Sequence, residues 1–444
     1  MRLQKPPLSF MQIINMNVGF FGIQYSFGLQ QSAVNPIYDM LGAKPDEIPL
    51  LNLAGPVTGL LIQPIIGALS DKTWSPQFGR RKPYFFIGAL LCSICLFFYP
   101  FSSTLWMAVG LLWVLDAANN TAMEPYRAFI ADKLPENQYA TGFLTQSFFT
   151  GLGITLANVC LYFFQKHIPG KAGALPYWVY ASFFLGTICS IGSVLWSISK
   201  TPEIPPSDEE LKKLKAEKLS ILTPFKEIPE AIRDMPAVMW KLALVYLFQW
   251  YALFCYWQNA AKSIAQSAWK VTSYQNNPQY DEAVGWTGLV NGWYNIVTFL
   301  SAFGLVWLAK KYSPRIVHVS CLLLAGAGLL IFPYIENKYL FFAPMTGFGI
   351  AWASMMGVPY LMVVNKIPKE RYGVYMGIIN MMIVIPMILQ NISFGYILKH
   401  FLHNDPGKAI SFAGVFLLIA AAATLRIQSE PSPEQEPIRM GSGH

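Results

Sequence analysis

The chain has 444 residues, of which 54% are hydrophobic and only 13% are charged. A soluble globular protein carries about 25% charged residues, so this composition argues against a soluble protein and predicts one embedded in a lipid bilayer. The net charge of +8 would suit a nucleic-acid partner, but the distribution of the basic residues points instead to membrane topology.

Apolar runs of about 20 residues recur along the whole chain, each long enough to cross roughly 30 Å of hydrocarbon. They predict an all-α membrane protein with twelve transmembrane helices. Residues 1–7 lead straight into the first run with no cleavage site, so no signal peptide is expected. The predicted spans lie near residues 9–35, 48–70, 83–101, 104–131, 139–164, 176–199, 237–261, 284–309, 316–334, 339–365, 373–398 and 408–425.

The basic residues are unevenly divided between the two sides of the predicted membrane. If both termini lie on one side, 23 of the 32 lysines and arginines fall on that side, eight fall on the other, and Arg127 lies within a span. Cytoplasmic loops carry such an excess. We therefore expect both termini in the cytoplasm and a multi-pass protein of a cell membrane, with the bacterial inner membrane as the expected location.

The longest hydrophilic stretch divides the spans six and six. The expected organisation is an N-terminal half (1–199), a cytoplasmic linker (200–236), a C-terminal half (237–428) and a tail (429–444). PYRAFIADKLPENQY (125–139) is echoed by PYLMVVNKIPKERY (359–372), which makes spans four and ten equivalents. Two parallel six-helix halves are the architecture of the major facilitator transporters. The protein is expected to be a monomer.

The loop after the second span contains GALSDK and then, six residues later, GRRKP. It resembles the signature loop of that superfamily, with an insertion before the second glycine. We interpret Asp71 as part of a gating latch that pairs with a nearby arginine; the alternative is a basic cluster that only sets topology. The expected charge network comprises Asp71, Arg80, Arg81, Glu124, Arg127 and Asp132.

Polar side chains form stripes at helical spacing on several spans, and in a bilayer such faces point at protein or water. Amides, hydroxyls and aromatic rings suit a sugar, because amides bind vicinal hydroxyls and rings stack on its C–H face. Only Arg127 and Lys262 would bring a cation near the cavity. The alternative is that the amides join helices. The candidate substrate-binding residues are Asn17, Gln24, Tyr25, Asp116, Asn120, Gln249, Tyr256, Asn291, Asn295, Trp352 and Asn380.

The fourth span continues into LDAANNTAMEPYRAFIADKLP, which places Asp116, Asn120 and Arg127 on one helical face. Asp116 and Arg127 are about 16 Å apart along the axis, too far for a salt bridge, whereas Arg127 can reach Glu124. A lone acid beside a polar cavity is a candidate proton carrier. The alternative is a permanently protonated acid that only donates a hydrogen bond.

LDAANNT, P-x-RA and AD within residues 115–132 are similar to the fourth span of the plant sucrose–proton symporters and their relatives. FGRRKP (78–83), TGLVNGWYN (287–295) and GIAWASMMGVPY (349–360) extend the resemblance over most of the chain. It implies that Asp116 couples proton to sugar and contacts the sugar, and that Arg127 is required for transport. One departure is Glu124, where plant members usually have glycine. The second span has no acid above Asp71, which favours protons over sodium.

The sequence therefore predicts a transporter that imports a disaccharide such as sucrose or maltose with a proton, by alternating access. The proton is the coupling ion, and no other cofactor or metal is expected. Two alternatives remain: a proton-coupled carrier of another neutral solute, and a non-transporting membrane sugar sensor. An enzyme is not expected, because the five histidines are scattered along the chain.

Overall fold

The computed structural model describes residues 5–206, 211–212, 232–363 and 372–427. These residues form long helices and one short β-hairpin, so the all-α prediction is confirmed. The N-terminal half contains α1 (Phe10–Leu29), α2 (Asn35–Met40), α3 (Ile48–Leu51), α4 (Ala54–Lys72), α5 (Lys82–Phe98), α6 (Leu105–Lys133), α7 (Tyr139–His167), β1 (Lys171–Ala172), β2 (Leu175–Pro176) and α8 (Tyr177–Lys200). The C-terminal half contains α11 (Ala237–Ala268), α12 (Pro278–Lys311), α13 (Pro314–Ile331), α14 (Phe342–Val363), α15 (Tyr372–His400) and α16 (Pro406–Thr424).

Local sequence signals set where these helices start and stop. Ser9 and Gln12 form a reciprocal capping box at the start of α1, and Asp405 accepts from two backbone N–H groups at the start of α16. Thr104 caps α6, which ends at Lys133, two residues before Pro135. Pro125 lies inside α6 and Pro359 inside α14, the fourth and tenth long helices, as the internal echo predicts.

Nine helical segments in the described part of the chain are long and apolar enough to cross a membrane. The three long helices outside that set are α1, α6 and α12, which carry seven of the eleven candidate substrate-binding residues. Twelve long helices, six in each half, are thus present among the described residues. The polar side chains that lower the hydropathy of three of them must be accommodated inside the bundle.

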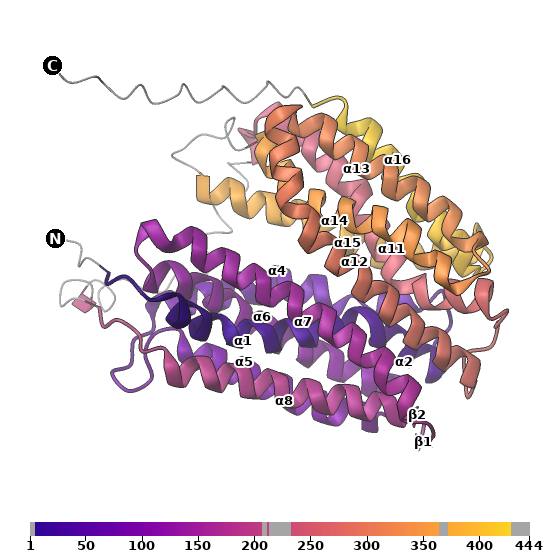
Figure 1. Cartoon of the computed structure of the whole chain (residues 1–444), viewed down its shortest axis with the longest axis horizontal. Helices are drawn as coiled ribbons and strands as arrows, with labels where there is room; N and C mark the ends of the chain where they lie inside the picture. Colours follow the sequence, from indigo (N-terminus) through magenta and orange to yellow (C-terminus); the bar gives the residue numbers. More distant parts are fainter. Residues whose placement is uncertain (1–4, 207–210, 213–231, 364–371, 428–444) are drawn as a thin grey trace.

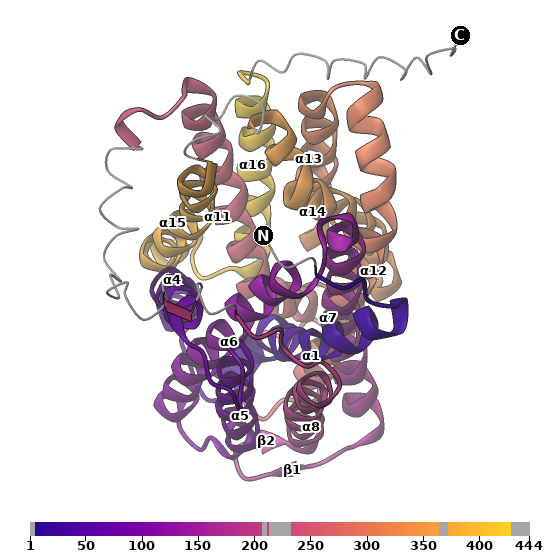
Figure 2. The same ribbon diagram turned by 90° about the vertical axis from the view of Figure 1, so that its left-hand side faces the viewer.

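The helices are arranged as two bundles that are inclined to each other (Figures 1 and 2). The bundles converge toward the end that carries the β-hairpin, here called the hairpin end. The described chain begins and ends at the opposite end, here called the terminal end, where α8 also finishes (Figure 1). Residues of the expected linker at 207–210 and 213–231, and the whole expected tail, lie outside the described residues.

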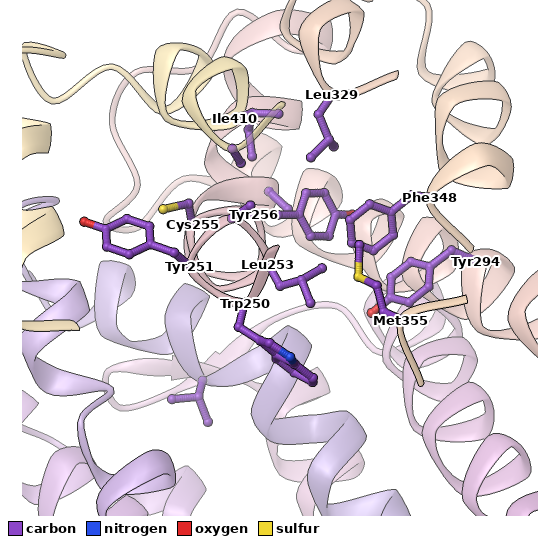
Figure 3. Close-up of a cluster of buried hydrophobic side chains, with 14 of the residues drawn as sticks. Trp250, Tyr251, Leu253, Cys255, Tyr256, Tyr294, Leu329, Phe348, Met355 and Ile410 are labelled. Carbon is purple, nitrogen blue, oxygen red and sulfur yellow. The ribbon is translucent and has the colours of Figure 1, made fainter. Parts of the chain in front are cut away.

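Small residues and rings make the packing within each half close. A Cβ on Gly22 of α1 would come 2.2 Å from the Cys189 carbonyl oxygen of α8, so only glycine allows these backbones to approach. In the C-terminal half, Tyr256 projects from α11 toward Phe348 and Tyr294 (Figure 3). The Tyr256 and Phe348 ring centroids are 4.7 Å apart.

The first predicted span differs from the structure in length and regularity. A π-helical turn, η1 (Gln30–Val34), follows α1, and the helix then continues through α2 to Met40, beyond the expected end at residue 35. The second predicted span is divided into α3 and α4. These differences place additional polar residues, Asp39 among them, inside the helical bundle.

Candidate functional site

Asp116 lies near the middle of α6 and is 3% exposed. Its neighbour Asn120 connects α6 to α4: the Asn120 amide donates to Thr58 Oγ1 at 3.1 Å, and its oxygen accepts from Gln63 Nε2 at 2.6 Å. Among the described residues, the Asp116 carboxylate forms no ion pair. The structure thus places a buried acid without a cationic partner beside an amide network.

The α4 face opposite Asp116 leaves space around the carboxylate. A Cβ on Gly55 would lie 3.6 Å from Asp116 Oδ2, and a Cβ on Gly59, one turn later, would meet no atom within 4 Å. Larger side chains at these positions would occupy that space. Glycine at both positions therefore keeps side chains of α4 away from the acid.

The residues predicted on the first span are buried. Gln24 Nε2 is 3.9 Å from Met123 Sδ of α6, which brings the α1 stripe next to the face that carries Asp116. Asn17 instead donates to the Ile13 carbonyl oxygen of its own helix at 2.9 Å. Tyr25 is fully buried.

Four predicted residues of the C-terminal half are also buried, and three of them are joined by hydrogen bonds. The Tyr256 hydroxyl donates to Asn291 Oδ1 at 2.9 Å, and Asn291 Nδ2 donates to Ser32 Oγ of the N-terminal half at 2.9 Å. Asn295 donates to the Asn291 carbonyl oxygen at 2.8 Å. Part of the predicted substrate-binding set therefore connects the two halves in this structure.

Gln249 is held by a residue that the sequence did not single out. His318 of α13 is fully buried, with Nε2 3.2 Å from Gln249 Oε1 and Nδ1 2.8 Å from Ser354 Oγ. Both ring nitrogens are thus engaged. A buried histidine between an amide and a hydroxyl fixes the orientation of Gln249.

Trp352 forms an aromatic group with two tryptophans of α11. Its ring centroid is 5.6 Å from that of Trp250 and 5.5 Å from that of Trp257, both edge to face. Figure 3 shows Trp250 projecting from α11 toward helices of the N-terminal half. Asn380 lies exposed on α15.

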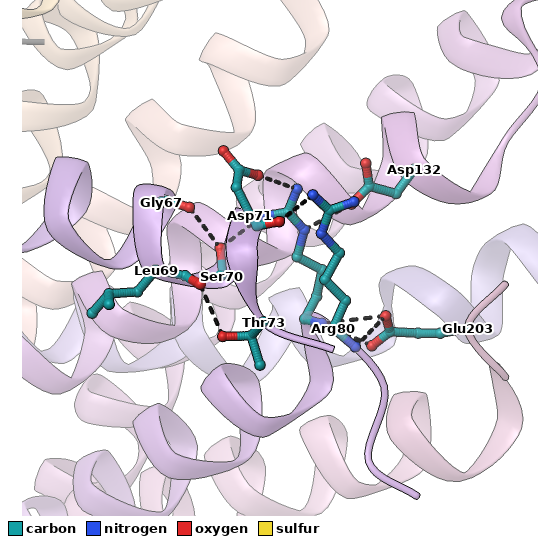
Figure 4. Close-up of polar contacts among 9 residues, drawn as sticks. Gly67, Leu69, Ser70, Asp71, Thr73, Arg80, Asp132 and Glu203 are labelled. Atoms are coloured by element: carbon teal, nitrogen blue, oxygen red, sulfur yellow. Dashed lines mark hydrogen bonds and ion pairs between the residues drawn. The ribbon is translucent and has the colours of Figure 1, made fainter. Parts of the chain in front are cut away.

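Part of the predicted charge network gathers around Arg81, which pairs with Asp71 and Asp132. Figure 4 shows Asp71 and Asp132 close together in this cluster. The Arg81 side chain is 4% exposed; Nε lies 2.7 Å from Asp132 Oδ2, and the guanidinium also pairs with Asp71 and donates to Ser70 Oγ at 2.6 Å. Burial opposes its charge, but the hydrogen bond and attraction of Asp132, followed by the attraction of Asp71, raise the pKa of Arg81 above its ordinary value.

Arg80 has a smaller role in this cluster, because its guanidinium donates to the backbone oxygen of Asp71. Glu203, at the start of the linker, accepts from the backbone N–H groups of Arg80 at 2.7 Å and Arg81 at 2.9 Å, and so holds the loop in place (Figure 4). Arg127 and Glu124 form a separate, half-exposed pair with a closest distance of 4.0 Å. All these residues belong to the N-terminal half and the start of the linker, so the role of Asp71 as a gating latch stays a prediction.

Sequence reasoning missed a buried ion pair at the hairpin end. Asp39 Oδ1 lies 3.3 Å from Lys262 Nζ, and Asp39 Oδ2 accepts from the Tyr280 hydroxyl at 2.6 Å. The predicted first span ends near residue 35, so it leaves Asp39 outside and gives Lys262 no acidic partner. Pro36 is the sequence signal for helix beyond residue 35, because proline is favoured in the first turn of a helix.

The model of the Major Facilitator Superfamily matches residues 16–390. The chain belongs to the Major Facilitator Superfamily. Among curated members, it is 24% identical over 514 residues to sucrose transport protein SUT1 of Oryza sativa subsp. japonica, covering 99% of this chain and 91% of that protein. It is also 24% identical over 470 residues to sucrose transport protein SUC4 of Arabidopsis thaliana, covering 93% and 90%.

Solved structures of superfamily transporters share the fold. The nucleoside transporter NupG matches with a TM-score of 0.67 at 13% identity, over 94% of this chain and 98% of that one. The D-xylose–proton symporter matches with a TM-score of 0.63 at 15% identity, over 95% and 98%. The expected resemblance to sucrose transport proteins is confirmed, and the family consists of transporters, as predicted for a chain that is not an enzyme.

Proposed function

We propose that this superfamily member imports a disaccharide, sucrose, maltose or a similar glucoside, together with a proton. The observation that carries the proposal is Asp116: a buried acid without a cationic partner among the described residues, next to the Asn120–Gln63 amide pair. The similarity to sucrose transport proteins over nearly the whole chain supports a sugar as the solute.

Asp116 is the proposed proton carrier. A carboxylate that no lysine or arginine neutralises can bind a proton when the sugar binds and release it when the sugar leaves. Gly55 carries no side chain where a Cβ would lie 3.6 Å from Asp116 Oδ2, which would allow the proton and a sugar hydroxyl to approach the same oxygen atom. Asn120 and Gln63 would then bind hydroxyls that only a polyhydroxylated solute supplies.

The excess of basic residues supports a cytoplasmic terminal end. In that orientation the two halves of this structure meet on the outer side. Arg127 and Glu124, which lie on α6 toward the terminal end from Asp116, have side chains that are 50% and 37% exposed. These exposures support access from the cytoplasm and hence an inward-facing form, the state in which an importer releases its solute.

Purified protein in liposomes tests this function. A panel of labelled sugars is offered with and without an imposed inward proton gradient, and the expected result is gradient-dependent accumulation of an α-glucoside. Competition by unlabelled glucosides and not by sugar acids or lipophilic cations is also expected. Accumulation that follows a sodium gradient alone, or preferential competition by glucuronate, would contradict the proposal.

A proton-coupled carrier of another neutral solute is the second candidate, because the amide and aromatic lining selects against charge and does not by itself specify a sugar. A non-transporting sensor is the third. The same panel separates them: a sensor binds sugar without accumulation, and a carrier of another solute accumulates a different neutral compound.

A further inference from the structure

The ion pair of Asp39, Lys262 and the Tyr280 hydroxyl joins the two halves of the molecule. Asp39 lies on α2 of the N-terminal half, whereas Lys262 and Tyr280 lie on α11 and α12 of the C-terminal half. The side chains of Asp39 and Lys262 are 1% and 2% exposed, and Tyr280 is fully buried. The three residues are called the hairpin-end lock below.

Other polar contacts between the halves surround this lock. Asn291 donates to Ser32, and Asn391 donates to the Asn52 carbonyl oxygen at 3.2 Å. At the rim, Lys399 and Asp46 form an ion pair at 3.1 Å in which Lys399 is 55% exposed. The lock is therefore the buried centre of an interface.

Backbone approach at this interface is as close as glycine permits. A Cβ on Gly395 of α15 would come 2.2 Å from the Asp46 carbonyl oxygen of the N-terminal half. Gly42, whose φ is +91°, lies beneath the Gln275 amide, which a Cβ there would approach to 2.5 Å. The side chains of Asp39 and Lys262 are 1% and 2% exposed, so the ion pair is shielded from water while the halves are together.

From this geometry we infer that Asp39, Lys262 and Tyr280 act as a lock that holds the hairpin end closed and sets the balance between the two facing states. This inference rests on the proposed transport function, because only a carrier that alternates needs this end to open. When the halves separate, water solvates both charges again. Separating the intact pair therefore costs little free energy. When one charge is removed, the other is buried without compensation only in the closed state. Loss of either charge thus favours the open state.

The test measures the distance between spin labels on the two halves by double electron–electron resonance in lipid nanodiscs. Lys44 and Glu336 are suitable label sites after substitution by cysteine, because their side chains are 72% and 76% exposed and belong to different halves. Neither sugar nor a proton gradient is required. A protein whose distances respond to the lock but that accumulates no sugar would therefore overturn the proposed function and leave the lock intact.

Asp39→Asn and Lys262→Gln should each raise the ratio of long to short distances at least tenfold, because each leaves one buried charge unpaired. The double variant should return most of the way toward the wild-type ratio, since neither charge then remains. Asp46→Asn, which breaks the half-exposed rim pair, is the matched control and should change the ratio less than twofold.

Tyr280→Phe keeps the packing and removes one hydrogen bond to Asp39, so it should raise the same ratio about threefold. If size-exclusion chromatography shows that a charge variant does not fold, Tyr280→Phe still tests the inference. Distances in Tyr280→Phe and in the folded charge variants that match those of Asp46→Asn would overturn the inference. A double variant that is shifted as far as the sum of the single variants would also overturn it.

Discussion

The hairpin end and the terminal end of the molecule both carry buried charge but use it between different partners. At the hairpin end, Asp39 and Lys262 come from opposite halves. At the terminal end, Arg81 gathers Asp71 and Asp132 from its own half. A pair between halves can exist only while they are together, whereas a cluster within one half survives their separation. The difference suggests that the hairpin end controls opening and that the terminal end preserves the shape of the N-terminal half.

The largest effect is expected from substitution of Asp116, which lies between the two ends. Asp116→Asn retains size and hydrogen bonding but cannot carry a proton, so gradient-driven sugar accumulation in liposomes should fall to background. Exchange of labelled for unlabelled sugar should persist, because both ends of the molecule are unchanged. Full accumulation by this variant would remove Asp116 from the coupling step.

The next largest effect is expected from Arg81→Gln, which tests the role of the charge cluster at the terminal end. The buried guanidinium supplies charged hydrogen bonds to Asp132, Asp71 and Ser70, so its loss should lower the free energy of unfolding by about 2 kcal/mol. Transport should slow about tenfold while sugar affinity stays within a factor of two.

Arg80→Gln is the matched control, since it loses a side-chain hydrogen bond to the Asp71 backbone oxygen. Thermal unfolding and uptake rates should distinguish the two arginines clearly. Equal effects of the two substitutions would show that the loop depends on its net charge and not on the geometry around Arg81.

Asn120→Ala should raise the apparent KM for sugar about tenfold. The substitution leaves the Gln63 amide and the Thr58 hydroxyl without their partner, a loss of about 1–3 kcal/mol for buried groups. Asn259→Ala is the control, because Asn259 is a buried asparagine that donates to the Cys255 carbonyl oxygen of its own helix. An unchanged KM in Asn120→Ala would place the sugar elsewhere.

The smallest effect is expected from breaking the Lys399–Asp46 rim pair at the hairpin end. Lys399→Gln removes a charge that is 55% exposed, and such surface pairs contribute about 0–1 kcal/mol. Uptake should change less than twofold, and the change should vanish at high salt. A larger effect would mean that the outermost charges, and not the buried lock, hold this end closed.

Hydropathy predicted the twelve helices well, because crossing a bilayer requires long apolar segments whose backbone hydrogen bonds are internal. It also marked the fourth span, where Asp116, Glu124 and Arg127 stand out against apolar neighbours. The roles given to these residues remain predictions, although the structure places Asp116 and Asn120 on α6 facing α4.

Partners on different helices were beyond the reach of sequence spacing. Asp39 and Lys262 are 223 positions apart, and only the packing of α2 against α11 brings them together. Glu203 lies in the predicted hydrophilic linker, although its carboxylate accepts from backbone N–H groups more than 120 positions away. For the same reason, the amide stripes gave no means of telling contacts with a solute from contacts between halves.

The π-helical turn in the first long helix has a consequence for the lock. A π turn accommodates one residue more than an α-helical turn, so every side chain after Val34 is rotated by about 100° relative to an uninterrupted helix. Asp39 reaches Lys262 in this rotated register. The fit between the two halves is therefore encoded in the length of a single segment: removing one residue from Gln30–Val34 would turn the acid away from its partner without altering any residue of the lock.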